Sequence, residues 1–350
     1  MILCPARLEP IFSPRPWGSH SLAPFFPEKS NLAEPLGEAW MTGVECRFAT
    51  GPFAGKKLGE AWSSMSAEWT GTRLGCDAPF PILVKFIFTE EKLSVQVHPD
   101  DEYAAKYETQ AGGRGKTEMW YALRASPDAE VMVGLKPGAT KENFRRAIQD
   151  GTAETLLTRI PVKASEAIFV PAGTVHTLGP GLVLCEIQEY SDLTYRVYDY
   201  NRRDALGKQR DLHIDKALDV IRFGEQTGGK IEPVKVNRDG LIETYFAACP
   251  YFATMEWKFS KRMTAVSSRE HFDLLIFLDG RGNFHWENGH AEYAPMQVWL
   301  LPAALGAYEL APESATTVLR TYVPENLEEF SQHLAQLGVP QPERSQIVHI

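Results

Sequence analysis

The chain has 350 residues, of which 44% are hydrophobic, and a formal net charge of −9 at pH 7. This length is sufficient for one large or two ordinary domains with a substantial buried core. The acidic balance, and the lack of a basic stripe with interleaved aromatic residues, argue against nucleic acid as a partner.

Targeting and redox signals favour a cytoplasmic protein. The first residues lack the apolar core of a signal peptide, and no later apolar run approaches the roughly 20 residues that span a bilayer. The five cysteines are odd in number and lie far apart, without a Cys-x-x-Cys pair. That pattern argues against a disulfide framework, so we expect a protein of the reducing cytoplasm with no membrane partner. Its oligomeric state is not indicated by the sequence.

Short apolar runs, rich in aromatic and β-branched residues and broken by Gly and Pro, recur along the chain. Their spacing is typical of strands in a sandwich or jelly roll and differs from that of alternating β and α units. The predicted strands are 80–88, 119–123, 129–133, 167–170, 182–187, 272–278 and 297–301. Helical periodicity occurs at 101–108, 140–149 and 214–223. The predicted fold class is therefore mostly β, with helical insertions.

A polar, glycine-containing segment at 223–237 predicts a domain boundary. We expect a larger domain over residues 1–230, with a helical insert near 137–161, and a smaller domain over residues 231–350.

The smaller domain contains a weak internal repeat of the larger one. Residues 273–278 are similar to 118–123, and residues 301–307 are similar to 170–176. The repeated copy has Ala307 in the position of His176, so a second barrel built on this pattern would hold no metal. Chance similarity between apolar strands is the alternative.

Two imidazoles, one carboxylate and one amide are candidates for a shared metal. Gln96 and His98 are two residues apart, so in a strand both project from the same face. Glu118 lies at the start of a predicted strand, and a turn-forming Pro-x-Gly-x-x-His places His176 at the start of another. A lone histidine on a half-apolar strand is more often structural, but this grouping favours a nitrogen and oxygen cage suited to zinc.

Several segments carry a specific resemblance to a known family. The Pro-x-Gly-x-x-His element matches the second signature of the cupin barrels. Order, spacing and flanking residues together resemble the type I mannose-6-phosphate isomerases (phosphomannose isomerases), in their short bacterial form. The segments that carry the resemblance are 81–87, 96–104, 115–121, 170–176 and 194–200.

This resemblance implies two cupin-type jelly-roll barrels, the second one metal-free. It also implies an aldose–ketose isomerase that interconverts mannose 6-phosphate and fructose 6-phosphate through an enediol or enediolate. Zn²⁺ would be the cofactor, held by Gln96, His98, Glu118 and His176. Longer members of the family have a histidine where this chain has Gly115, so the catalytic role of that histidine is not transferable.

Three charged residues are the predicted catalytic groups. Glu186 lies in an apolar strand, where desolvation raises the pKa of a carboxyl group, and is the predicted base. In the resembled family an acidic residue stands ten positions before a motif arginine, as Glu186 stands before Arg196. An edge-strand surface glutamate is the alternative. The guanidinium of Arg196 suits an enediolate or phosphate oxygen, with a structural ion pair as its alternative. Lys116, two residues before Glu118, projects to the same face.

The predicted substrate contacts are Lys85, Ser94 and Arg202. Lys85 lies in an otherwise apolar strand, where its ammonium group needs an anion. Ser94 shares a strand face with Gln96. Arg202, or its neighbour Arg203, lies in a polar loop, where a solvated surface charge is the alternative. Residues 36–40 are interpreted as structural.

Two other functions compete with the isomerase. Cupin barrels also host metal-dependent dioxygenases, and a nonenzymatic sugar-binding bicupin could keep its metal for structure alone. The presence of Glu186, Lys116 and Arg196 beside the cage argues against the second, because a structural zinc does not need them.

Overall fold

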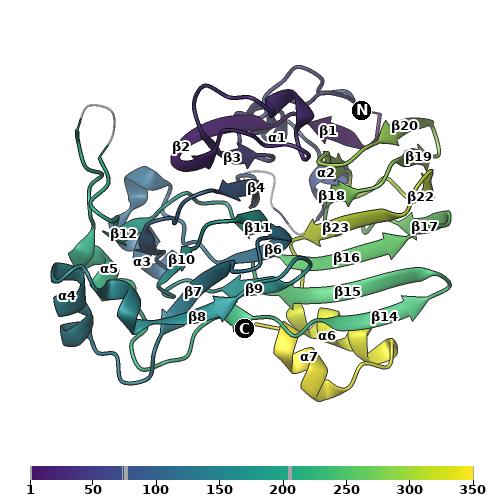
Figure 1. Ribbon diagram of the computed structural model, residues 1–350. Coiled ribbons are helices and arrows are strands. Elements are labelled where there is room, and N and C mark those ends of the chain that lie inside the picture. Colours follow the sequence, from purple (N-terminus) through teal and green to yellow (C-terminus); the bar gives the residue numbers. More distant parts are fainter. Residues whose placement is uncertain (1, 73, 75–77, 204–206, 350) are drawn as a thin grey trace.

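The computed structural model describes residues 2–72, 74, 78–203 and 207–349. Within these ranges most of the regular structure is strand, arranged in four antiparallel sheets, and the helices lie at the periphery (Figure 1). The predicted mostly β fold class is confirmed. The described ranges contain no helix that is long and apolar enough to cross a membrane. Four of the five cysteines are free thiols, and Cys76 falls outside the described residues.

The first barrel consists of a seven-stranded and a five-stranded sheet that face each other across an apolar core. In spatial order, the larger sheet contains β13 (Gly229–Lys230), β9 (Ala167–Val170), β6 (Glu118–Ala125), β11 (Leu182–Glu189), β4 (Ile82–Thr89), β3 (Leu36–Trp40) and β2 (Ile11–Ser19). The smaller sheet contains β12 (Tyr195–Tyr198), β5 (Val95–Val97), β10 (His176–Leu178), β7 (Glu130–Leu135) and β8 (Leu157–Pro161).

The central strands of the larger sheet are buried on both faces, which explains why their sequences are almost continuously apolar. In β4, Val84 and Phe86 face the second barrel, whereas Lys85 and Ile87 face the interior of the first. The same alternation in β11 turns Glu186 towards that interior and Cys185 away from it. Because of this alternation, Lys85 and Glu186, the charged residues within these apolar runs, point into one cavity.

Helices cover the outer face of the five-stranded sheet. These are α4 (Lys141–Gln149) and α5 (Ile214–Val220), at the edge of the molecule farthest from the second barrel (Figure 1). Helix α4 begins after Thr140, whose hydroxyl oxygen accepts a hydrogen bond from the backbone N–H of Asn143 at 3.2 Å. Both predicted helices, and α3 (Asp101–Tyr107), are confirmed. The remaining helices are α1 (Leu58–Trp62), α2 (Ala67–Thr70), α6 (Leu327–Gln336) and α7 (Gln341–Ile347), with 3-10 turns at η1 (Pro27–Lys29), η2 (Thr109–Ala111) and η3 (Ala153–Leu156).

Phe144 of α4 anchors this helical cover, because its ring is fully buried against the outer face of the sheet. We expect Phe144→Ala to lower the free energy of unfolding by about 3–5 kcal/mol, the usual loss when a buried aromatic ring leaves a cavity. Urea unfolding followed by circular dichroism measures this change. Gln149→Ala, at an exposed position of the same helix, is the control and should change stability by less than about 0.5 kcal/mol. Equal stability of the two variants would contradict the assigned packing.

The second barrel again pairs a seven-stranded sheet with a smaller one. The larger contains β1 (Ala6–Leu8), β21 (Val298–Leu301), β18 (Asp273–Asp279), β23 (Thr316–Tyr322), β16 (Ala253–Phe259), β15 (Leu241–Ala248) and β14 (Val234–Arg238). The smaller contains β17 (Met263–Val266), β22 (Ala307–Pro312), β19 (Gly282–Trp286) and β20 (Gly289–Tyr293).

The strand pairing departs from the predicted division of the chain at one point. Strand β1 belongs to the larger sheet of the second barrel, where Ala6 pairs with Leu300. A three-residue strand is too short for its sequence to indicate a partner almost 300 residues away. A single boundary near residue 230 therefore assigns β1 to the first domain, although it pairs within the second barrel. The rest of the division stays a prediction.

The register of the two large sheets supports the proposed internal repeat. Glu118 pairs with Val170 in the first barrel, and Asp273 pairs with Leu301 in the second. These are the positions that the sequence similarity equates. The carboxylate of Asp273 lies 3.0 Å from the guanidinium of Arg320, so the second barrel places an arginine against this carboxylate.

The two seven-stranded sheets pack against each other and share one apolar core (Figure 1). The rings of Phe169 and Phe252 are 6.4 Å apart across this interface. The hydroxyl of Tyr121 donates a hydrogen bond of 2.6 Å to Glu256. The first barrel therefore has one large face against its neighbour and the other under helices, and its polar residues point into its interior.

Candidate metal centre and active site

Strands from both sheets of the first barrel bring the predicted metal ligands together. Gln96 lies in β5, whose neighbouring Val95 and Val97 belong to the outer apolar cluster, so its side chain points inwards. His98 follows β5. Glu118 begins β6, and His176 begins β10, directly across from Gln96 in the antiparallel ladder.

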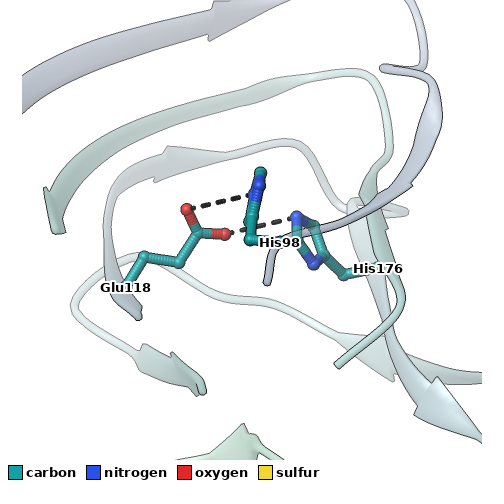
Figure 2. Close-up of side chains that lie close together, drawn as sticks. All are labelled: His98, Glu118 and His176. Atoms are coloured by element: carbon teal, nitrogen blue, oxygen red, sulfur yellow. Dashed lines mark ion pairs between the residues drawn. The ribbon is translucent and has the colours of Figure 1, made fainter. Parts of the chain in front are cut away.

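The carboxylate of Glu118 faces both imidazoles (Figure 2). Its Oε1 is 3.3 Å from Nε2 of His176, and its Oε2 is 3.7 Å from Nε2 of His98. All three side chains are 1% exposed. Their ligand atoms lie within 4.8 Å of one another, close enough to hold one metal ion, and the three residues are called the metal-binding group below.

Hydrogen bonds to the backbone fix the tautomer of both imidazoles. Nδ1 of His98 donates to the carbonyl of Leu193 at 2.7 Å, and Nδ1 of His176 donates to the carbonyl of Thr174 at 2.9 Å. Because a carbonyl oxygen only accepts, Nδ1 carries the proton and Nε2 presents a lone pair. Backbone carbonyls orient metal-binding imidazoles in this way in many proteins.

Protonation of the two imidazoles is disfavoured. Burial, together with the charge of Lys116, holds the pKa of His98 well below its usual value, and burial lowers the pKa of His176 to about 4. Two neutral imidazole nitrogens therefore face a carboxylate, and Nε2 of His98 has no hydrogen-bond partner among the described residues. Lone pairs that face one another without a proton suit a cation between them, and this nitrogen and oxygen donor set fits Zn²⁺.

The amide of Gln96 is next to this group. Its Nε2 is 3.2 Å from Nε2 of His176, so the amide donates to the imidazole lone pair in this arrangement. A half-turn of the amide exchanges its nitrogen and oxygen. The oxygen would then occupy the position that the predicted fourth ligand requires.

Lys116 and Glu186 lie directly beside the metal-binding group. Nζ of Lys116 is 2.8 Å from Glu118 and 2.9 Å from Glu186, and both Lys116 and Glu186 are 4% exposed. Burial opposes the charge of Lys116, but the two carboxylates outweigh it and raise the pKa of the lysine. Burial also raises the pKa of Glu186, which the positive charge of Lys116 only partly offsets. The pair thus combines a cation with a carboxyl group whose pKa is raised, an arrangement suited to proton exchange.

A cavity of about 480 Å³ opens onto these groups. Its wall includes Lys85, which pairs with Asp192 at 2.6 Å and lies 4.3 Å above the ring of Trp40. The buried lysine of β4 thus has the anion that its position requires. Ser94 and Arg196 also line the cavity, and Nε of Arg196 donates to the hydroxyl of Ser94 at 3.2 Å.

Comparison with known proteins decides the family. Residues 6–136 match the family model of the phosphomannose isomerase type I catalytic domain. The probable mannose-6-phosphate isomerase GmuF of Bacillus subtilis is 36% identical over 311 residues, which cover 87% of this chain and 96% of that protein. The chain belongs to the type I mannose-6-phosphate isomerase family.

Solved mannose-6-phosphate isomerases share the fold over nearly the whole chain. The crystal structure of the mannose 6-phosphate isomerase from Bacillus subtilis matches with a TM-score of 0.82 and 31% identity, covering 91% of this chain and 99% of that one. A zinc-bound mannose 6-phosphate isomerase with 15% identity matches with a TM-score of 0.72, covering 91% and 99% of the two chains, and shows the same fold.

Of the three predicted substrate contacts, Arg202 lies outside this cavity. Its guanidinium faces the carbonyl of Lys92 and lies 3.4 Å from the carboxylate of Asp199. It lines a neighbouring depression instead. The local sequence does not encode which of the two depressions the side chain of Arg202 lines.

Several cavity residues are not predicted from the sequence. Arg15 of β2 and Glu38 of β3 line the cavity, as does Arg210 in the loop after β12. The structural interpretation of residues 36–40 omits Glu38, which accepts hydrogen bonds from Arg15 at 2.8 Å and from Nε1 of Trp40 at 2.7 Å. The signal in the sequence is Glu38-Ala39-Trp40. Residues two apart in a strand share a face, so the carboxylate of Glu38 and the indole of Trp40 project to the same side.

Proposed function

We propose that this protein interconverts mannose 6-phosphate and fructose 6-phosphate and that Zn²⁺ is its cofactor. One observation carries the proposal: His98, Glu118 and His176 form a buried metal-binding group that opens, through Lys116 and Glu186, into a cavity of hexose size. Membership of the mannose-6-phosphate isomerase family supports it, as does the zinc in the related structure of the same fold.

In the proposed reaction Glu186 moves one proton between adjacent carbons. Its carboxylate removes the proton from C2 of the open-chain aldose, which leaves negative charge on O1. O1 then gains a proton while O2 loses one, and Glu186 delivers its proton to C1 as the carbonyl forms at C2. The enediolate that forms between these steps carries negative charge on oxygen. Lys116, whose ammonium is 2.9 Å from Glu186, and Arg196 are the cations in the cavity that would stabilise this charge.

Zinc would be held by His98, Glu118, His176 and the amide oxygen of Gln96. When bound, it would supply Lewis-acid polarisation of a substrate oxygen. Lys85 would contact the sugar from β4, and Ser94 would orient Arg196.

The reducing cytoplasm is the proposed location. The described cysteines, Cys4, Cys46, Cys185 and Cys249, are all free thiols, which matches a compartment in which disulfides do not persist.

The direct test is a coupled assay of fructose 6-phosphate formation from mannose 6-phosphate by the purified protein. We expect activity to disappear after chelation and to return when Zn²⁺ is added, because the site needs a cation to hold its lone-pair donors together. Elemental analysis of the same samples should find about one zinc per chain before chelation. Activity that requires oxygen and ferrous iron would instead favour a cupin dioxygenase, and zinc binding without turnover would favour the nonenzymatic bicupin.

A further inference from the structure

The small sheet of the second barrel carries a row of side chains that can ligate a metal. In the hairpin of β19 and β20, His285 pairs directly with His290, and in the neighbouring ladder His285 pairs with Glu309 of β22. Residues that are paired across antiparallel strands project to the same face of a sheet. Two imidazoles and a carboxylate from three adjacent strands therefore lie side by side.

This row lies on the outer face of the sheet, because the alternate residues of the same strands are buried. Phe284, Tyr293 and Tyr308 belong to the apolar core and are at most 3% exposed. His285 is half-buried and His290 is exposed. The larger sheet of the second barrel separates this small sheet from the first barrel (Figure 1). The row is therefore distinct from the metal-binding group.

The two imidazoles are close enough for one ion to bind both. Their ring centroids are 6.0 Å apart and their planes differ by 27°. In the metal-binding group of the first barrel the corresponding distance, between the rings of His98 and His176, is 4.9 Å. Neither imidazole of the outer pair forms a hydrogen bond or ion pair with another described residue. Exposed side chains change rotamer freely, so a small rotation can direct both rings at one ion.

The carboxylate of Glu309 is available as a third ligand. It is 23% exposed and lies 3.0 Å from the guanidinium of Arg262, whose side chain is 68% exposed. An exposed ion pair of this kind contributes little to stability, so a metal ion can readily displace the arginine. Glu292, two residues after His290 on β20, shares the same face and adds negative charge there.

We propose that His285 and His290, with Glu309, bind a divalent late transition metal such as Ni²⁺ or Cu²⁺. Imidazole nitrogens favour these ions over Ca²⁺ and Mg²⁺, which prefer oxygen ligands. Water fills the remaining coordination positions, and the site is open to solvent, so its ion exchanges more readily than one in the buried metal-binding group. Dialysis empties this outer site, and the zinc that remains afterwards reports on the first barrel alone.

The test is a calorimetric titration of the zinc-loaded, tag-free protein with Ni²⁺. The wild-type protein should bind about one Ni²⁺ per chain. Loss of groups that only support a ligand already weakens metal binding by roughly 10–100-fold, so His285→Ala and His290→Ala should each weaken it by at least about tenfold. Glu309→Gln should have a smaller effect, because both imidazoles remain. His333→Ala, which removes an exposed histidine of α6, is the matched control and should bind Ni²⁺ as the wild type does.

A spectroscopic measurement identifies the ligands directly. With a substoichiometric amount of Cu²⁺, the nitrogen splitting in the electron paramagnetic resonance spectrum should indicate two imidazoles in the wild-type protein and one in His290→Ala. Elemental analysis after the Ni²⁺ titration should find the zinc still in place. The proposal is overturned if His290→Ala binds Ni²⁺ as tightly as the wild type, if His333→Ala weakens binding equally, or if nickel enters only as zinc leaves, which would place it in the first barrel.

Discussion

Replacing His176 with alanine is expected to remove both the metal and the catalytic activity. The imidazole is 1% exposed, and its Nε2 is 3.3 Å from Glu118 in the centre of the metal-binding group. Loss of residues that only support a ligand already weakens metal binding by roughly 10–100-fold, so loss of the ligand itself should exceed that range. Elemental analysis after dialysis and the coupled isomerase assay measure the two effects.

His290→Ala serves as the control for this experiment. His290 is an exposed histidine on β20 of the second barrel, so its loss should change neither zinc content nor turnover. If the His176→Ala protein kept one zinc per chain through dialysis, the assignment of His176 as a ligand would be wrong.

Replacing Glu186 with glutamine is expected to separate metal binding from catalysis. The substitution conserves volume, and Glu186 is outside the group of His98, Glu118 and His176, so zinc content should stay unchanged. Lys116 would keep its contact of 2.8 Å with Glu118. Without a carboxylate to move the proton, kcat should fall by roughly 10²–10⁴-fold, the usual contribution of a positioned general base.

Solvent deuterium provides a second measurement of the same role. The wild-type enzyme should place deuterium at C2 of mannose 6-phosphate at equilibrium in D₂O. In Glu186→Gln the rate of this exchange should fall by the same factor as kcat. Glu166→Gln, at a half-buried ion pair with Lys230 on the outside of the barrel, is the control. Full activity in Glu186→Gln would exclude Glu186 as the base.

The pH profile follows from the same residue. Burial raises the pKa of Glu186, so this carboxyl group stays protonated at pH values at which an ordinary glutamate, with a pKa of about 4.3, has ionised. A base acts only when it is deprotonated. The acidic limb of kcat/KM should therefore lie above the usual glutamate range, with activity lost as the pH falls through it, and should be absent from the residual activity of Glu186→Gln.

The sequence is most informative where a strand has two buried faces. In such runs a single charged residue is conspicuous, which is why the apolar pattern singles out Lys85 in β4 and, together with the family resemblance, Glu186 in β11. The Gln-x-His and Pro-x-Gly-x-x-His spacings similarly place Gln96, His98 and His176 on inward faces, and the structure brings them together with Glu118.

The open end of the cavity could not be predicted in the same way. Arg15 and Arg210 lie in polar surroundings, where a cation is ordinary, and the local sequence does not show that their side chains line the cavity. That placement depends on long-range contacts such as the one between Arg15 and Glu38. For Arg202 a solvated loop position is equally consistent with the local sequence, and in the structure this side chain is 17% exposed, pairs with Asp199 and faces the carbonyl of Lys92.

The apolar core between the two large sheets has a consequence for how the chain reaches this state. While the polypeptide is being synthesised, the face of the larger sheet of the first barrel that carries Tyr121 and Phe169 lacks its partners Phe246 and Phe252 until residues beyond 240 have emerged. Strand β1 can pair only later, because its partner residue Leu300 is synthesised near the end of the chain. Nascent chains with such late-sealed surfaces are prone to aggregate. Expression at low temperature or with abundant chaperones should therefore raise the yield, and truncation after the first barrel should leave an insoluble fragment.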